Sequence, residues 1–123
     1  MKPSAFLIAL LIALPTPLVF AKGRVLECAI TKLPSNDILH KGQCYYLPHK
    51  GGSFALLKAE GEGALYASVG MVTVYVMGRD TAEVTRLVKE EDGESRNDTW
   101  GEAKRSKADS ACWEGAEFRI CAW

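Results

Sequence analysis

Six residues of this chain carry the most reactive side chains, and they are the cysteines and histidines Cys28, Cys44, Cys112, Cys121, His40 and His49. Thiols and imidazoles bind metals, act as nucleophiles and transfer protons. The two histidines are nine residues apart and do not form the H-x-x-x-H spacing of a helical zinc site. A metal or acid–base site would have to add Asp37 or Glu27. We therefore expect no metal, no cofactor and a solvent-facing or turn position for both histidines.

The N-terminus reads as an export signal. Met1 and Lys2 form a short positive region, residues 6–14 form an uninterrupted apolar run, and Ala21 ends a small-residue cleavage pattern. We expect residues 1–21 to be a signal peptide and residues 22–123 to be one domain, periplasmic or secreted. Of 15 basic and 15 acidic residues, cleavage removes only Lys2. The near-zero net charge argues against a nucleic-acid partner.

All four cysteines follow the cleavage site, so export would place them in an oxidising compartment where they form two disulfides. Sequence spacing favours the local pairs Cys28 with Cys44 and Cys112 with Cys121, and the open alternative joins Cys28 to Cys121. Each local bridge would close a loop of roughly 10 to 17 residues and stabilise the fold by about 2.5 to 3 kcal/mol. Paired cysteines are not available as nucleophiles.

The serines and most carboxylates lack the surroundings that catalysis needs. No serine lies within G-x-S-x-G, and Glu60 and Glu62 lie at a turn rather than in a cleft that would raise a pKa. The acidic segment at residues 90–98 lacks the ligand spacing of a calcium-binding loop, but its carboxylates could dock a cationic protein. The residues that we expect to bind a partner are Glu90, Glu91, Asp92, Glu94, Asn97, Asp98 and Trp100.

The aromatic residues suggest two further roles. Tyr45, Tyr66, Tyr75 and Trp100 are expected on faces opposite the core or in polar loops, where they could stack on a glycan. Trp113 and Trp123 are expected to pack against the C-terminal disulfide. The terminal aromatic residue resembles the end of an outer-membrane barrel, but the charge density of the chain argues against stable membrane insertion.

Short alternating strands separated by turn signals predict an all-β domain, either a small antiparallel barrel or a sandwich. Residues 25–32, 38–47, 53–59, 71–77 and 82–89 are the expected strands before the C-terminal hairpin, with a break or bulge at Gly70. The segment 90–110 is polar and has little hydrophobic pattern. We expect a hairpin tip at Asp92-Gly93 and, later, a short edge strand or one helical turn.

The C-terminal residues A-C-W-E-G-A-E-F-R-I-C-A-W, together with W-G-E-A-K-R-S before them, resemble those of small exported proteobacterial proteins that end in a Cys-Trp, turn, Ile-Cys-Ala hairpin. The resemblance covers about a third of the expected domain, and it implies a fold and a compartment but no activity.

The first hypothesis is a non-catalytic cell-envelope module of the protein-interaction, inhibitory or immunity type. A small hydrolase using His40 or His49 and a glycan-binding module are the alternatives.

Overall fold

The computed structural model describes residues 22–123, and the predicted signal peptide lies outside the described residues. The domain is all-β, as predicted, and forms a closed antiparallel barrel rather than a sandwich. Eight strands and one short 3-10 turn follow one another along the chain: β1 (Arg24–Lys32), β2 (Asp37–Pro48), η2 (Lys50–Gly52), β3 (Phe54–Lys58), β4 (Val69–Gly78), β5 (Thr81–Lys89), β6 (Ser95–Arg105), β7 (Cys112–Gly115) and β8 (Phe118–Ala122).

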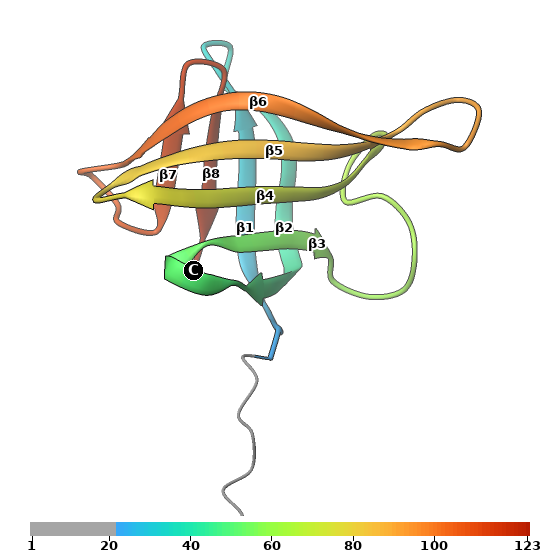
Figure 1. The fold of residues 1–123 in the computed structure, drawn as a ribbon, viewed down its shortest axis with the longest axis horizontal. Helices are drawn as coiled ribbons and strands as arrows, with labels where there is room; N and C mark the ends of the chain where they lie inside the picture. The colour runs from blue at the N-terminus through green and yellow to red at the C-terminus, as the bar shows by residue number, and fades with distance from the viewer. Residues whose placement is uncertain (1–21) are drawn as a thin grey trace, which may run out of the picture.

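Each strand pairs with its neighbours in sequence, and β8 returns to pair with β1. The strands β4, β5 and β6 run across β1, β2, β7 and β8 (Figure 1). The interior lies between these two crossing layers, and side chains that alternate along each strand point into it. No helix among residues 22–123 is long and apolar enough to cross a membrane.

One hydrophobic cluster fills the barrel and contains residues from all eight strands. The predicted inward faces are confirmed, because Cys28 and Ile30 in β1 and Val72 and Val74 in β4 are buried. The largest fully buried side chains include Trp113, Phe118, Ile30, Leu56 and Ile120. Burial of such apolar area is the main force that stabilises a small domain.

Both predicted local disulfides are present. Cys28 is bonded to Cys44 across β1 and β2, and Cys112 is bonded to Cys121 across β7 and β8. The two tryptophans that were expected to pack against the C-terminal disulfide lie in different surroundings. Trp113 enters the core, whereas Trp123 remains 55% exposed and its indole Nε1 donates a hydrogen bond to Asp109.

The polar segment 90–110 contains a full strand, β6, where the sequence predicted at most a short edge strand or a helical turn. Its backbone pairs with β5 over nine register positions. The alternation of apolar and polar residues along β6 is weak, because its inward residues include Gly101 and Ala103, which contribute little hydrophobicity. The predicted irregularity at Gly70 is confirmed, since the β4–β5 register shifts between Val69 and Met71.

Candidate functional site

The acidic segment predicted to bind a partner forms the tip of the β5–β6 hairpin. The Glu94 N–H donates to Asp92 at 2.9 Å, and the Glu90 N–H donates to the Glu94 carbonyl at 2.7 Å. Glu90 is paired with Arg96, so part of the acidic charge is neutralised within the hairpin itself. Glu91, Glu94 and Asn97 are exposed.

Asp98 and Trp100, the last two predicted binding residues, both contact Arg86. Asp98 forms an ion pair with Arg86 and lies 3.6 Å from a second guanidinium nitrogen, on Arg96. Hydrogen bonding to Arg86 lowers the pKa of Asp98. The guanidinium carbon of Arg86 lies 4.4 Å from the Trp100 ring centre. Trp100 is half-buried and packs against Phe118, with ring centres 4.7 Å apart.

The aromatic platform predicted for a glycan does not form as expected. Tyr66 and Trp100 pack against the core, so their predicted placement away from it was wrong. The Tyr66 hydroxyl is buried without a hydrogen-bond partner among the described residues, and burial raises its pKa. Tyr45 is half-buried and Tyr75 is 46% exposed. A stacking surface would need adjacent exposed rings.

The two histidines lie near opposite ends of β2, His40 close to its start and His49 just past its last residue. Nine residues of extended strand place them about 30 Å apart, so they do not share one site. His49 is exposed at the start of η2. His40 is half-buried, with its Nε2 3.1 Å from the Gln43 carbonyl, and it lies beside the Cys28–Cys44 disulfide.

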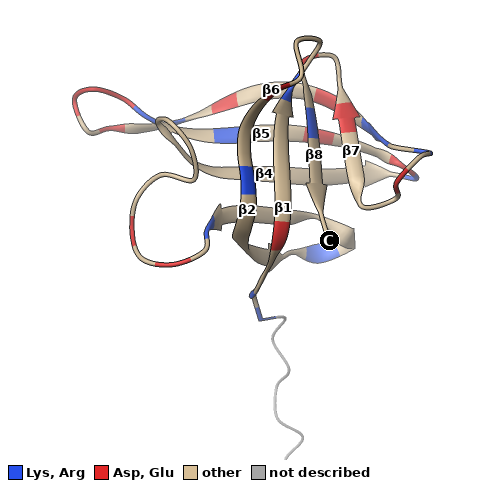
Figure 2. Cartoon of the chain, turned by 180° about the vertical axis from the view of Figure 1, so that it is seen from behind, with Lys and Arg blue, Asp and Glu red and all other residues tan. Residues whose placement is uncertain are grey.

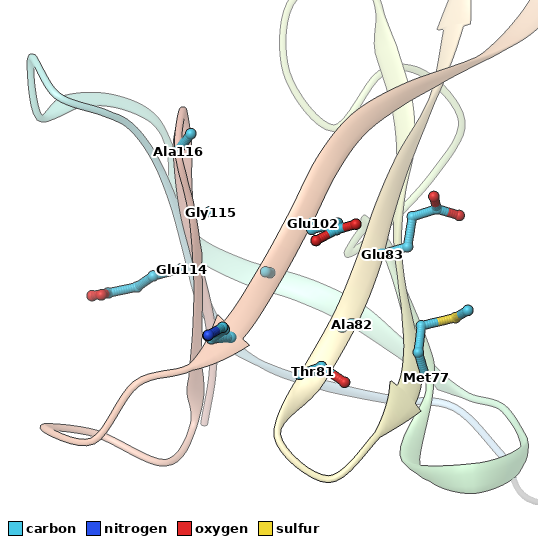
Figure 3. A pocket seen from close by; sticks show the side chains of 10 residues that line it. Met77, Thr81, Ala82, Glu83, Glu102, Glu114, Gly115 and Ala116 are labelled. Atoms are coloured by element: carbon cyan, nitrogen blue, oxygen red, sulfur yellow. The ribbon is translucent and has the colours of Figure 1, made fainter.

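A groove of about 560 Å³ lies where the β4–β6 layer meets β7 (Figure 3). One wall comes from β4, β5 and β6, and the other comes from the end of β7 and the turn after it. In the view of Figure 3 the side chains of Glu83 and Met77 project to the right, away from β7, whereas the side chain of Glu114 projects to the left, away from β5 and β6. The residues that line the groove include Met77, Thr81, Glu83, Glu102, Lys104, Glu114, Gly115 and Ala116.

Two exposed glutamates that line this groove occupy opposed positions on neighbouring strands. Glu83 of β5 is directly opposite Glu102 of β6, and neither has an ion-pair partner among residues 22–123. Like charges at directly opposed positions destabilise a sheet. Glu114, by contrast, pairs with Arg119 at 2.7 Å. The Glu83–Glu102 pair therefore places two negative charges side by side without an ion-pair partner among the described residues, and Lys104 is the lysine that lines the same groove.

Exposed apolar side chains adjoin this carboxylate pair. Tyr75 of β4 is directly opposite Glu83, on the edge of β5 that faces away from β6. The side chain of Tyr75 is 46% exposed, and that of Met77 is 70% exposed. Sequence reasoning identified neither Glu83 nor Glu102 as a site residue. The inward position of Val84 implied an outward Glu83, but the position of Glu102 required the β6 register.

Charges of both signs are distributed over the strands and loops of the rest of the barrel (Figure 2). The net charge of the whole chain is zero, so any electrostatic preference for a partner has to come from a local arrangement. Comparison with protein-family models, curated proteins and solved structures gives no match to this chain.

Proposed function

We propose that this protein is an exported, non-catalytic binding module whose partner is a protein that inserts a basic side chain into the groove between β5–β6 and β7. The observation that carries the proposal is the Glu83–Glu102 pair, two carboxylates at directly opposed positions that have no ion-pair partner among the described residues, although Lys104 lines the same groove. A partner ammonium or guanidinium group between them would remove their mutual repulsion and add charge-assisted hydrogen bonds.

The surroundings of the pair support a protein partner. Tyr75 and Met77 supply exposed apolar area beside the carboxylates, and tyrosine and methionine are enriched at protein interfaces. The predicted Glu90 tip is a weaker candidate than the sequence suggested, because Arg86 and Arg96 already neutralise Asp98 and Glu90. Export to the periplasm or outside the cell fits the disulfides.

Photo-crosslinking from the groove in the native host tests this proposal. A photoreactive residue at Met77 should yield a discrete adduct with one protein, whereas the same residue at Ile38 should not. Met77 and Ile38 are similarly exposed, at 70% and 64%, so Ile38 controls for exposure alone. If adducts formed equally at the two positions, or at neither, the groove would not be the binding surface.

Charge reversal then tests the carboxylate pair. The double variant E83K/E102K should weaken capture of the crosslinked partner by about tenfold or more, because opposed like charges across an interface are strongly unfavourable. The matched control E60K/E62K makes the same charge change at exposed loop positions and should retain capture. If both variants lost capture of the partner equally, the cause would be the change in net charge, and this result would contradict a specific site.

A further inference from the structure

We propose a metal site that is independent of the groove: with the Cys28–Cys44 disulfide reduced, Cys28, Cys44 and His40 bind one zinc-class divalent cation. The two sulfurs and an imidazole nitrogen of His40 all lie within 4.8 Å of one another. Two thiolates and an imidazole are a donor set that zinc prefers, with a fourth position left for water.

The register of two neighbouring strands brings these three residues together. His40, Gly42 and Cys44 occupy alternate positions of β2, so they share one face of the strand. Cys28 of β1 is directly opposite Gly42 and therefore lies diagonally between His40 and Cys44. No atom lies within 4 Å of the point where a Cβ on Gly42 would be, which leaves room for the side chains to rearrange around an ion.

The hydrogen bond made by His40 prepares its ring for coordination. Nε2 is 3.1 Å from the backbone carbonyl of Gln43, and a carbonyl oxygen only accepts, so Nε2 carries the proton and donates it. In the neutral ring the lone pair then resides on Nδ1, which we assign as the metal ligand. A metal-binding histidine typically donates its other ring N–H to a carbonyl or carboxylate in this way, which fixes the ring orientation and raises ligand basicity.

The burial of the sulfurs favours a cation once they are reduced. Cys28 and Cys44 are 1% and 0% exposed, and two unpaired thiolates at such a position would be very costly. A divalent cation cancels their charge. A tetrahedral zinc ion has sulfurs at about 2.3 Å and a nitrogen at about 2.0 Å, so the two sulfurs must separate to roughly 3.8 Å, which side-chain rotation after reduction allows.

The chemical step requires a dithiol reductant. The Cys28–Cys44 sulfur–sulfur bond accepts two electrons and two protons from the dithiol, which is itself oxidised to a disulfide. The cation then replaces the two thiol protons, which leave to solvent. In the oxidised protein both sulfurs are bonded to each other and the site is closed, so metal binding depends on the redox state.

The test titrates residues 22–123 with Co²⁺ and Zn²⁺ before and after reduction by a phosphine, which binds metal more weakly than a thiol reductant. We expect one equivalent of Co²⁺ to bind only the reduced protein and to give a thiolate-to-cobalt charge-transfer band, which Zn²⁺ displaces. His40→Ala should weaken binding by about tenfold or more. His49→Ala, just past the far end of the same strand, should leave it unchanged.

Two further measurements distinguish this site from metal binding elsewhere in the reduced chain. The variant C112A/C121A should keep the band, because the second disulfide is not part of the site. If reduction loosens the fold, zinc should restore the β-sheet circular dichroism of the wild type and of His49→Ala but not that of His40→Ala. Cobalt binding that is absent after reduction, or that is equal in wild type and His40→Ala, would overturn the proposal.

Discussion

Arg86 is the residue that organises charge and aromatic packing at the base of the β5–β6 hairpin. It forms an ion pair with Asp98 and stacks over Trp100, and Trp100 in turn packs against Phe118 of β8. A cation that is paired on one side and stacked on an aromatic face on the other is well satisfied. Arg86 therefore links the hairpin to the core rather than presenting a free charge.

The Asp98–Arg86 pair predicts a specific acid sensitivity. Because the folded state lowers the pKa of Asp98 below its ordinary value of 3.8, the charged form stabilises the fold above that pH. This stabilisation is lost as the pH falls through the lowered pKa. Asp98→Asn should cost roughly 1 kcal/mol or less at pH 7, and the difference from wild type should shrink below about pH 4.

Urea unfolding at a series of pH values measures this difference. Glu91→Gln is the matched control, since Glu91 is exposed on the same hairpin and has no ion pair among the described residues. A gap between wild type and Asp98→Asn that stays constant from neutral to strongly acidic pH would mean that the ion pair does not contribute.

At the residue scale, the sequence predicted positions better than contacts. Alternation placed Cys28, Ile30, Val72 and Val74 inward, and local spacing favoured the two disulfides that form. The sequence did not predict the contact of His40 with the disulfide, because Cys28 and His40 come together only through the strand register. It also misplaced Trp100, since a tryptophan in a polar run carries no sign of which face it occupies.

At the element scale, β6 is the strand that sequence reasoning could least predict and that the groove most depends on. Its hydrogen-bonded pairing with β5 is extensive, but pairing between backbones leaves no signature in side-chain type. Its register with β7 comprises three pairs, Ala103 with Gly115, Lys104 with Glu114 and Arg105 with Trp113. This short β6–β7 seam closes the barrel and also forms the floor of the groove.

Gly115→Ala should disrupt the β6–β7 seam. A Cβ at this position would lie 2.5 Å from the Phe118 ring and 2.7 Å from the Glu102 carbonyl oxygen. Because Phe118 is fully buried and the carbonyl belongs to the backbone, neither atom can move freely. Overpacking of this kind costs about 1 to 3 kcal/mol, which should appear as a lower urea midpoint.

Gly70→Ala is the control for this substitution. The nearest atom to its Cβ is the Leu87 carbonyl oxygen at 3.9 Å, an ordinary contact, so we expect a change of about 0.5 kcal/mol or less. Hydrogen exchange should show that Gly115→Ala increases exchange at amides of β6 and β7 before those of β1 and β2. Equal destabilisation by the two alanines would show that the seam is not tightly packed.

At the scale of the whole molecule, the barrel of residues 22–123 is built around one shared core. The buried cluster includes Ile30 of β1, Leu56 of β3, Val84 of β5 and Phe118 of β8, so no layer can open without exposing the side chains of the other. Interdependence of this kind favours one cooperative unfolding transition. The two disulfides each join adjacent strands within this unit.

Two core substitutions in strands that do not pair with each other test this cooperativity. Leu56→Ala in β3 and Ile120→Ala in β8 each remove a side chain that is 0% exposed, and each should lower the free energy of unfolding by about 2 to 5 kcal/mol. Because both sites belong to one cooperative unit, the slope of free energy against urea should stay unchanged. Val25→Ala, at a position 46% exposed, should have little effect.

Far-UV circular dichroism and tryptophan fluorescence should report the same urea midpoint in each variant, because Trp113 and Trp100 belong to or pack against the same core cluster as the mutated residues. Different midpoints from the two probes would show that the β4–β6 layer and the β1, β2, β7, β8 layer unfold separately. The groove would then form between two independently stable layers, and mutations in the core of one layer would leave the Glu83–Glu102 pair in place. A shared transition instead ties the geometry of that pair to the closure of the whole barrel.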